Sequence, residues 1–491
     1  MSMRTVKEPV SVRAGKLYAA YCGRLPRSTH AMMIYGAALS LLFSGLIAVY
    51  NISAGPLSNL NDIGGWDNRL LFIAMTAAVQ VLLLLLTTAL SGKSYLRIAL
   101  RQAIVTAGFV IQLLAINQKT HAFVEQLLPL IRQMDVHGLS AIAQMETNLS
   151  SPALTLIYLV TRGPIYDMYM VKLLCAAAFC VLCLMAMHAA DRNGMGIRSE
   201  VLLALCLILP QGFMSAACAA QIDVLAVTLT AAALALCLRE KPLAWAGTIC
   251  YGAAIAVSGA ALYALPVFVM LMLRGRMKGV QLALCAAIPV VLCLPAVLAG
   301  QNILAALASL VRVVFGVPDF AAGAPNLMNF FPRAAMEEMP EYFMLGKMSN
   351  VDPFTNFSPY YTLESFAMIM HGMALAGFAL YAMAFAFVQR RGMEKTAGAF
   401  ALALAAGIAC PGATAGAWLL VSVIALYAIV SAPRLRIPAC AVLFAAMCSA
   451  AYPVTAEIML PMEVALIICL LALFDLLGMF DANRKEDAAH E

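Results

Sequence analysis

The chain has 491 residues, of which 63% are hydrophobic and only 11% carry a charge. Soluble globular proteins carry about 25% charged residues, so this composition leaves too little polar surface to cover a soluble body of this size. The formal net charge of +6 is spread over many short segments, which argues against a nucleic-acid partner. The composition predicts an all-α, multi-pass helical membrane protein.

Apolar runs separated by breaker residues predict about fourteen membrane spans, because about 20 apolar residues cross the hydrocarbon core of a bilayer as a helix. The expected spans are 31–50, 70–90, 98–116, 168–190, 199–215, 222–238, 242–257, 261–273, 279–299, 363–388, 396–410, 417–432, 437–453 and 456–479. The expected organisation is a basic leader (1–30), N-terminal spans (31–116), a membrane core (117–432), C-terminal spans (433–480) and a tail (481–491). The leader is longer than that of a cleaved signal peptide and is expected to remain attached.

The basic residues predict the orientation of the chain. Most of the 31 Lys and Arg residues fall in the leader, the tail and alternate short loops, which the positive-inside rule assigns to the cytoplasm. Both termini are therefore expected to be cytoplasmic, in a plasma membrane. The long loops 117–167 and 300–362 fall outside, where Asp223, the pair Ser258–Gly259 and the stretch Pro411–Gly416 also open. An outward-facing site built from several loops is the natural expectation.

Two segments of the first outer loop read as surface helices. The stretch "THAFVEQLLPLIRQM" has apolar residues at helical spacing and polar ones between them, as in an interfacial amphipathic helix. The stretch "SSPALTLIYLVTRGP" is too short to span alone and is expected to form an interfacial or re-entrant helix, with Pro152 in its first turn. The second outer loop, 300–362, is rich in Pro, which excludes a long helix. Its aromatic residues either line a ligand groove or form an interfacial belt.

The order of these features resembles the GT-C superfamily of integral-membrane glycosyltransferases, and most closely bacterial proteins related to the GPI-anchor mannosyltransferases. Over about residues 110–430, "HAFVEQLLP" resembles the family's first outer loop, "ACAAQIDVLAVTL" its W-G-Q-x-D signature and "AGAPNLMNFFP" its loop with an Asn-Pro-Asn feature. Of the signature, Gln221 and Asp223 remain, while Ala219 and Ala220 occupy the Trp and Gly places.

Other family positions differ in this chain. Ser258 stands at the family's Lys position, and "PGATAGAW" stands where a His-Glu-Arg-Tyr stretch is expected. The family's general-base Asp would fall at Ala122, beside His121 and Glu125.

The resemblance implies transfer of a sugar from a polyprenyl-phosphate donor to a glycan or lipid acceptor of the cell envelope. Such chemistry needs a base for the acceptor hydroxyl and cationic groups, or a divalent metal, for the leaving phosphate. The candidate catalytic residues are Asp223, Glu125 and Asp62, and the candidate substrate-binding residues are Gln221, Lys172, His121, Asn326 and Arg333. No metal ligands are assigned, because no Asp-x-Asp pair occurs.

Structural alternatives stand beside these roles. Lys172 either snorkels to the interface or meets a lipid phosphate. His121 either begins an interfacial helix or belongs to the site, and Asp223 either complements the dipole at a helix N-terminus or is the surviving part of the signature. The alternative function is a non-catalytic relative that binds a lipid-linked sugar or a partner protein. A lipid transporter or flippase is less favoured, because the polar features gather on one face rather than at mid-membrane.

Overall fold

The computed structural model describes most of the helical core. The described residues are 66–91, 95–145, 147, 149–162, 167–239, 242–315, 324–330, 342–344, 360–362, 372–373, 376–381, 395–410 and 414–490, together with the isolated positions 38, 42 and 45. The predicted leader, nearly all of the first predicted span, and the candidates Asp62 and Arg333 lie outside these residues.

The protein is a helical membrane protein. Five helical segments are long and apolar enough to cross a bilayer, namely Leu71–Leu90, Leu96–Ala115, Tyr169–Arg192, Gly279–Leu298 and Pro433–Thr455. A sixth crossing is reached if one bent helix pair counts as a single span, and six shorter apolar helices accompany them in the described part of the chain. The prediction of a polytopic helical protein is confirmed, and the number of fourteen spans stays a prediction.

The principal helices follow the predicted runs closely. They are α3 (Trp66–Leu90), α4 (Tyr95–Ala115), α7 (Asp167–Arg192), α10 (Asp223–Cys237), α11 (Ala244–Val257), α12 (Leu265–Leu273), α13 (Gly279–Leu292), α14 (Leu294–Leu298), α18 (Lys395–Ala409), α19 (Leu419–Ser431), α20 (Arg436–Thr455) and α21 (Met462–His490). A 3-10 turn, η4 (Gly259–Ala264), leads into α12. Long runs of Leu, Ala and Val give helices in lipid, since every backbone polar group must be satisfied within the segment.

The predicted span 199–215 is broken. It consists of α8 (Arg198–Leu207), α9 (Pro210–Phe213) and the π-helical turn η3 (Met214–Cys218), and the two halves meet at an angle of 45°. The break falls just before Pro210, which lacks an N–H group and starts the second half at its first helical position. Gly212 lets this second half approach α7, because a Cβ atom there would lie 2.1 Å from the ring of Phe179.

The residues of the predicted first outer loop form helices at both expected places. A π-helical turn, η1 (Ala122–Leu127), continues into α5 (Leu128–His137), whose buried residues Ile131 and Met134 lie one turn apart. The 3-10 segment η2 (Gly138–Gln144) follows, and α6 (Ser151–Thr161) carries Pro152 in its first turn as expected. Most side chains of α6 are buried, so this helix is packed into the protein rather than lying on its surface.

The second outer loop contains one helix that the sequence interpretation did not include. Within 300–362, the amphipathic helix α15 (Ile303–Phe315) ends before the first proline of the loop. The 3-10 turn η5 (Leu327–Phe330) follows it. The antiparallel pair β1 (Tyr342–Met344) and β2 (Tyr360–Thr362) is joined in the register Phe343 to Tyr361.

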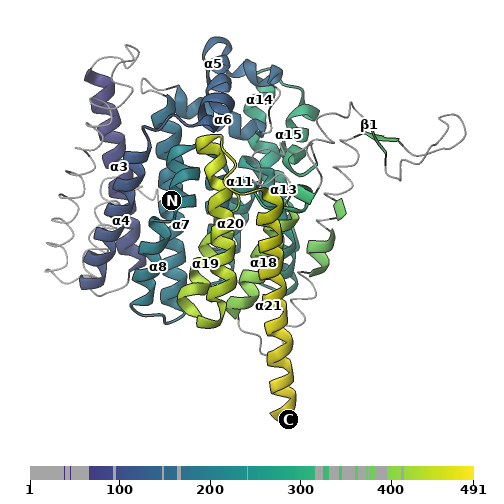
Figure 1. Ribbon diagram of the computed structural model, residues 1–491. Coiled ribbons are helices and arrows are strands. Elements are labelled where there is room, and N and C mark those ends of the chain that lie inside the picture. The colour runs from purple at the N-terminus through teal and green to yellow at the C-terminus, as the bar shows by residue number, and fades with distance from the viewer. Residues whose placement is uncertain are drawn as a thin grey trace, which may run out of the picture.

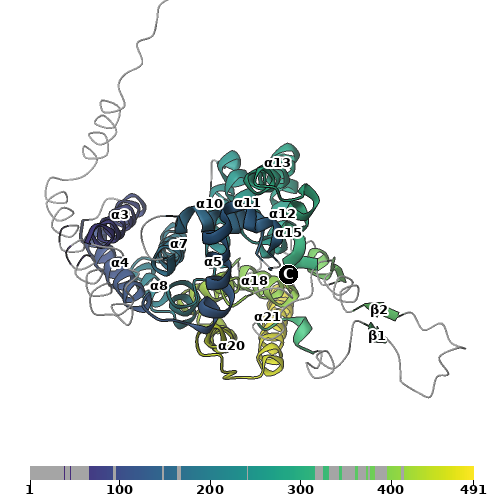
Figure 2. The ribbon, with the colours of Figure 1, turned by 90° about the horizontal axis from the view of Figure 1, so that it is seen from above.

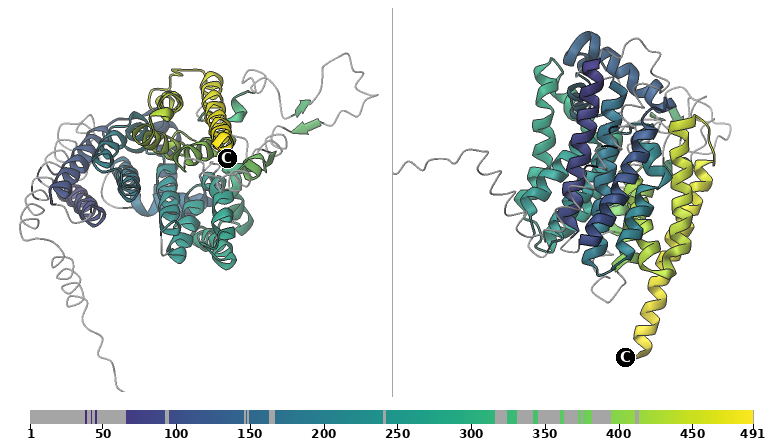
Figure 3. Two further views of the ribbon diagram at one scale, coloured as in Figure 1. Left: turned by 90° about the horizontal axis from the view of Figure 1, so that it is seen from below. Right: turned by 90° about the vertical axis from the view of Figure 1, so that its left-hand side faces the viewer.

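The helices form a bundle with distinct ends (Figure 1). Helices α5 and α6 lie at the upper end, and the C-terminal end of α21 extends beyond the other helices at the lower end, as Figure 3 also shows. Seen from above, α3 and α4 lie on one side, α12 and α13 on the other, and α20 and α21 along a third edge (Figure 2). One large apolar core joins α4, α7, α8, η3 and α10, and a second joins α18 to α21.

Candidate functional site

Lys172 is the buried cation at the upper end of the bundle. It lies near the start of α7 and its side chain is fully buried. Its ammonium donates hydrogen bonds to the backbone carbonyls of Ile116, at 3.2 Å, and Gln118, and it lies 5.3 Å from the centre of the Phe123 ring. Lys172 therefore ties the chain leaving α4 to the start of α7. In the part of the chain that the structure describes, no carboxylate forms an ion pair with it.

Asp223 stands at the first residue of α10, at the same end of the bundle. Its side chain is half-buried, and the hydroxyl of Thr414 donates a 2.6 Å hydrogen bond to Oδ2. Thr414 is held in turn, since its hydroxyl accepts from the backbone N–H of Ala417. The other carboxylate oxygen, Oδ1, has no hydrogen bond among the described residues. The carboxylate is thus fixed by one oxygen and open at the other.

Gln221 links these two charged residues. Its backbone carbonyl accepts a bond from the thiol of Cys175 at 3.6 Å, and Cys175 lies within electrostatic reach of both Lys172 and Asp223. The side chain of Gln221 packs against Gly416, where a Cβ atom would lie 2.9 Å from its Oε1. The stretch "PGATAGAW" therefore contacts the Gln221–Asp223 pair through Thr414 and Gly416.

The backbone around this site is irregular. The turns η1 and η3 are both π-helical, and the hydroxyl of Thr120 joins them by donating to the carbonyl of Cys218 at 3.0 Å. Ala220, between η3 and α10, has φ +54°, a left-handed conformation that L residues other than Gly adopt at a cost. Single π-helical turns and strained residues cluster at functional sites in proteins. The outer cluster, defined as Lys172, Gln221, Asp223 and Thr414, is therefore the candidate site.

The structure brings some of the candidate residues together and separates others. Lys172, Gln221 and Asp223 come together, and His121 lies at the start of η1 with its ring edge-on to Tyr452 at 6.0 Å. Glu125 is exposed on η1 and is separated from the buried side of that turn, where Phe123 lies.

Asn326 is buried near η5, where its side-chain amide donates to the carbonyl of Ala324 at 2.9 Å. Ala324 belongs to the apolar core of α18 to α21, so Asn326 serves the packing of that region. Among the described residues, no group of three or more side chains could hold a metal ion. The candidate Asp62 lies outside these residues.

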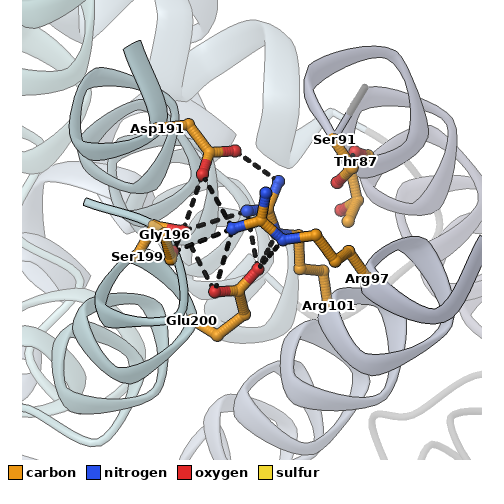
Figure 4. Close-up of polar contacts among 8 residues, drawn as sticks. All are labelled: Thr87, Ser91, Arg97, Arg101, Asp191, Gly196, Ser199 and Glu200. Atoms are coloured by element: carbon orange, nitrogen blue, oxygen red, sulfur yellow. Dashed lines mark hydrogen bonds and ion pairs between the residues drawn. The ribbon is translucent and has the colours of Figure 1, made fainter. Parts of the chain in front are cut away.

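Sequence reasoning missed a second polar cluster, drawn in Figure 4, at the other end of α4 and α7. Arg101 is fully buried. Its guanidinium nitrogen Nη1 lies 2.6 Å from a carboxylate oxygen of Asp191, and Nη2 lies 2.7 Å from one of Glu200. Arg97, 39% exposed, pairs with Glu200 at 3.0 Å and donates to the carbonyl of Gly196 at 2.8 Å. Ser199 donates to Asp191 and accepts from Arg101. The inner cluster, defined as these five side chains, joins α4 to α7 and α8.

The inner cluster is structural in character. Two arginines face two carboxylates, so its formal charges cancel and no group is left to attract an ion. The sequence alone predicts only an orientation signal from basic residues of this kind. Their carboxylate partners lie about a hundred residues away in sequence, as the separations of 90 to 103 residues show, and no local pattern marks them.

Comparisons with known proteins add no relative: no protein-family profile, no curated protein sequence and no solved structure matches this chain.

Proposed function

We propose that this protein is a membrane glycosyltransferase of the GT-C kind, which transfers a sugar from a polyprenyl-phosphate donor to an acceptor hydroxyl at the outer membrane face. The carrying observation is Asp223, a half-buried carboxylate with one oxygen fixed by Thr414 and the other without a hydrogen bond among the described residues. A general base must be positioned in this way, held rigidly and still able to take a proton.

The left-handed backbone of Ala220 also supports the proposal. The W-G-Q-x-D signature has Gly at this place, and Gly adopts positive φ without the steric cost that a Cβ atom brings. Ala220 has φ +54° while Gln221 and Asp223 keep their signature places. The chain thus retains the backbone shape that the signature's Gly would favour, and that shape presents Gln221 and Asp223 together.

In the proposed orientation, the protein lies in the plasma membrane with the outer cluster on the outside and both chain termini in the cytoplasm. Lys172 and Asp191 lie on one helix, nineteen residues apart, which corresponds to about 28 Å along its axis. The two polar clusters are therefore separated by about the thickness of the hydrocarbon core. Asn193, in the loop after α7, donates a 2.6 Å hydrogen bond to the hydroxyl of Tyr427 near the end of α19. The loop after α7 and the end of α19 therefore lie at the same end of the bundle as the inner cluster.

A second candidate is a non-catalytic relative that binds a lipid-linked sugar or a partner protein. The observation that favours it is the inward position of Lys172, whose ammonium is engaged by two backbone carbonyls. Within the described residues of the outer cluster, no other cation is available to stabilise a leaving phosphate, a role that the reaction requires. The arginine expected for such a contact, Arg333, lies outside the described residues.

The experiment reconstitutes the full-length protein in vesicles with a radiolabelled polyprenyl-phosphate sugar and follows release of the sugar from its lipid. Asp223→Asn keeps the side-chain size and removes the proton acceptor, and it is expected to lower turnover by at least the ~100-fold contribution typical of a general base. Binding of the donor lipid should stay close to that of the wild type.

The matched control is Asp135→Asn, which changes an exposed carboxylate on α5 at the same end of the bundle. Turnover should survive this substitution. Equal turnover in wild type and Asp223→Asn would refute the role of Asp223. Donor binding without turnover in the wild type would instead establish the non-catalytic alternative.

A further inference from the structure

Backbone contacts join the segments that carry four polar residues at the inward side of the outer cluster. They are Gln112 on α4, Lys172 on α7, Ser215 on η3 and Gln221 before α10, and they are called the Gln112 cluster below. Gln112, Lys172 and Ser215 are at most 1% exposed, and Gln221 is half-buried. None of them contributes to the inner cluster, and only Lys172 and Gln221 belong to the candidate site.

Helix geometry brings these side chains together. The thiol of Cys218 on η3 contacts the carbonyl of Ala115 on α4, and both segments run in the same direction through the bundle. Gln112 lies three residues before Ala115, and Ser215 lies three residues before Cys218. The two residues are therefore at the same level, about one turn closer to the inner cluster. Lys172 binds the carbonyl of Ile116, one turn above Gln112, and the carbonyl of Ser215 accepts from the backbone N–H of Gln221 at 2.9 Å.

The polar atoms of this cluster lack partners in the described part of the protein. Both amide atoms of Gln112, the hydroxyl of Ser215 and Oε1 of Gln221 are buried without a hydrogen bond. Lys172 has three N–H donors and uses two of them on backbone carbonyls. Buried polar atoms are nearly always paired, because an unpaired one loses its hydrogen bonds to water without gaining others.

Other buried amides of the same bundle have at least one partner. Gln80 donates to Thr106, Gln102 donates to Thr88, and Gln211 both donates to the carbonyl of Ala415 and accepts from Ser422. Single unpaired atoms occur elsewhere among the described residues, Oε1 of Gln80 and the hydroxyl of Thr76 among them, but Gln112 has both of its amide atoms unpaired.

We propose that the Gln112 cluster binds ordered water, which bridges Gln112 and Ser215 and reaches Lys172 and Gln221. Water fits because the cluster offers donors, from Lys172 and the amide of Gln112, and acceptors, from Gln112 and Gln221. An internal water is stable where two to four polar groups surround it, and this cluster supplies that number. An anion would leave the glutamine acceptors unpaired, and a cation would be repelled by the ammonium.

This water supplies the third hydrogen bond of Lys172 and allows the ammonium to stay charged inside the bundle without a carboxylate partner. It connects the half-buried Gln221 near the surface with the fully buried Gln112 one turn deeper. The proposal concerns this cluster alone and holds whether or not the protein transfers sugars.

X-ray footprinting of the full-length protein in lipid nanodiscs tests it. Microsecond X-ray pulses convert bound water into hydroxyl radicals, which modify side chains beside that water even where bulk solvent has no access. Cys175 and Cys180 are both fully buried on α7, but only Cys175 contacts the cluster, through the carbonyl of Gln221. Cys175 is expected to be modified several-fold faster than Cys180. An equal or slower rate at Cys175 would overturn the proposal.

Two variants give an independent readout. Gln112→Leu and Ser215→Ala are each expected to lower the footprinting rate of Cys175 and the midpoint of thermal unfolding, because each removes a group that holds water. In a dry cluster, Gln112→Leu would raise the midpoint, since it removes an unpaired buried amide. Gln102→Leu is the control, because it breaks a protein-protein hydrogen bond to Thr88 and should lower the midpoint while leaving the Cys175 rate unchanged.

Discussion

At the scale of single residues, Lys172 and Asp223 show how differently two charges are accommodated at one end of a bundle. Lys172 is fully buried and is held by backbone carbonyls and an aromatic face. Asp223 is half-buried, at the N-terminus of α10, where the helix dipole favours a negative charge. The dipole alone does not require the bond from Thr414, which comes from a segment 191 residues away. That bond is what fixes the orientation of the carboxylate.

Ala220 is the residue whose backbone is most at odds with its side chain. Ala220→Gly is expected to raise the free energy of unfolding by about 1 kcal/mol, because Gly adopts the left-handed conformation without the clash of a Cβ atom. The measurement is the midpoint of thermal unfolding in detergent. The contrasting variant is Ala233→Gly in the middle of α10, which should lose about 1 kcal/mol, since a helix interior favours Ala. A loss of stability in both variants would show that Ala220 is unstrained.

At the scale of elements, the inner cluster is the tie between α4 and the α7–α8 pair. Arg101 and Glu200 are buried, Arg97 is 39% exposed, and the two arginines pair with the two carboxylates, so the arrangement depends on all of its members being present. A buried ion pair contributes little compared with an apolar contact of the same shape, but removal of one partner leaves an uncompensated charge. The inner cluster therefore fixes which helices pack together rather than adding much net stability.

Arg101→Met is expected to destabilise the protein by about 3–5 kcal/mol, because Asp191 and Glu200 would lose their central partner inside the bundle. Unfolding by increasing denaturant in mixed micelles measures this loss. Arg198→Met, which changes an exposed arginine at the start of α8, is the matched control and should change stability by less than ~0.5 kcal/mol. Similar losses in both variants would contradict the structural role of Arg101.

At the scale of the whole molecule, the proposed orientation puts the two polar clusters at the two edges of the bilayer. They lie at opposite ends of α4 and α7, and the helix surface between them presents leucines to the surroundings, Leu82 and Leu85 of the neighbouring α3 among them. Exposed side chains of this kind would be costly in water and are natural in hydrocarbon. These exposed leucines fit the proposed placement of the bundle, in which the polar clusters lie at the two membrane interfaces.

The proposed orientation is tested by labelling from outside. Ser140→Cys on η2 and Asn193→Cys after α7 lie at opposite ends of the bundle, and both are expected to tolerate the change. In intact cells a membrane-impermeant maleimide should label Ser140→Cys and not Asn193→Cys, and permeabilisation should make both reactive. The reverse pattern would mean that the outer cluster faces the cytoplasm.

Hydropathy predicted α3, α4, α7 and α20 within a few residues, because apolar runs of bilayer length leave the chain no other satisfied conformation in lipid. It did not predict the break at Pro210, since the residues on either side are equally apolar and only the absent N–H group interrupts the helix. The helix α15 was hidden by the prolines that follow it.

The candidate site was partly predictable in the same sense. The polarity of Gln221 and Asp223 stood out against their apolar surroundings, and the structure brings Lys172 to them. The exposure of Glu125 could not be predicted from the sequence, because it depends on which side of η1 packs against the bundle. Thr414 and the partners of Arg101 are joined to the clusters only by tertiary contacts, which leave no mark at short range.

Synthesis of the chain gives Arg97 and Arg101 two successive tasks. When α4 leaves the ribosome, about ninety residues remain to be made before Asp191 and Glu200 follow, so the two guanidinium groups are unpaired positive charges during the decision on which way α4 enters the membrane. In the proposed orientation, these charges hold the start of α4 in the cytoplasm during that period. Once α7 and α8 are inserted, the same charges are neutralised by Asp191 and Glu200, with Arg101 buried and Arg97 39% exposed. A topological signal is thus converted into an internal joint, and the insertion of α4 cannot easily be reversed afterwards.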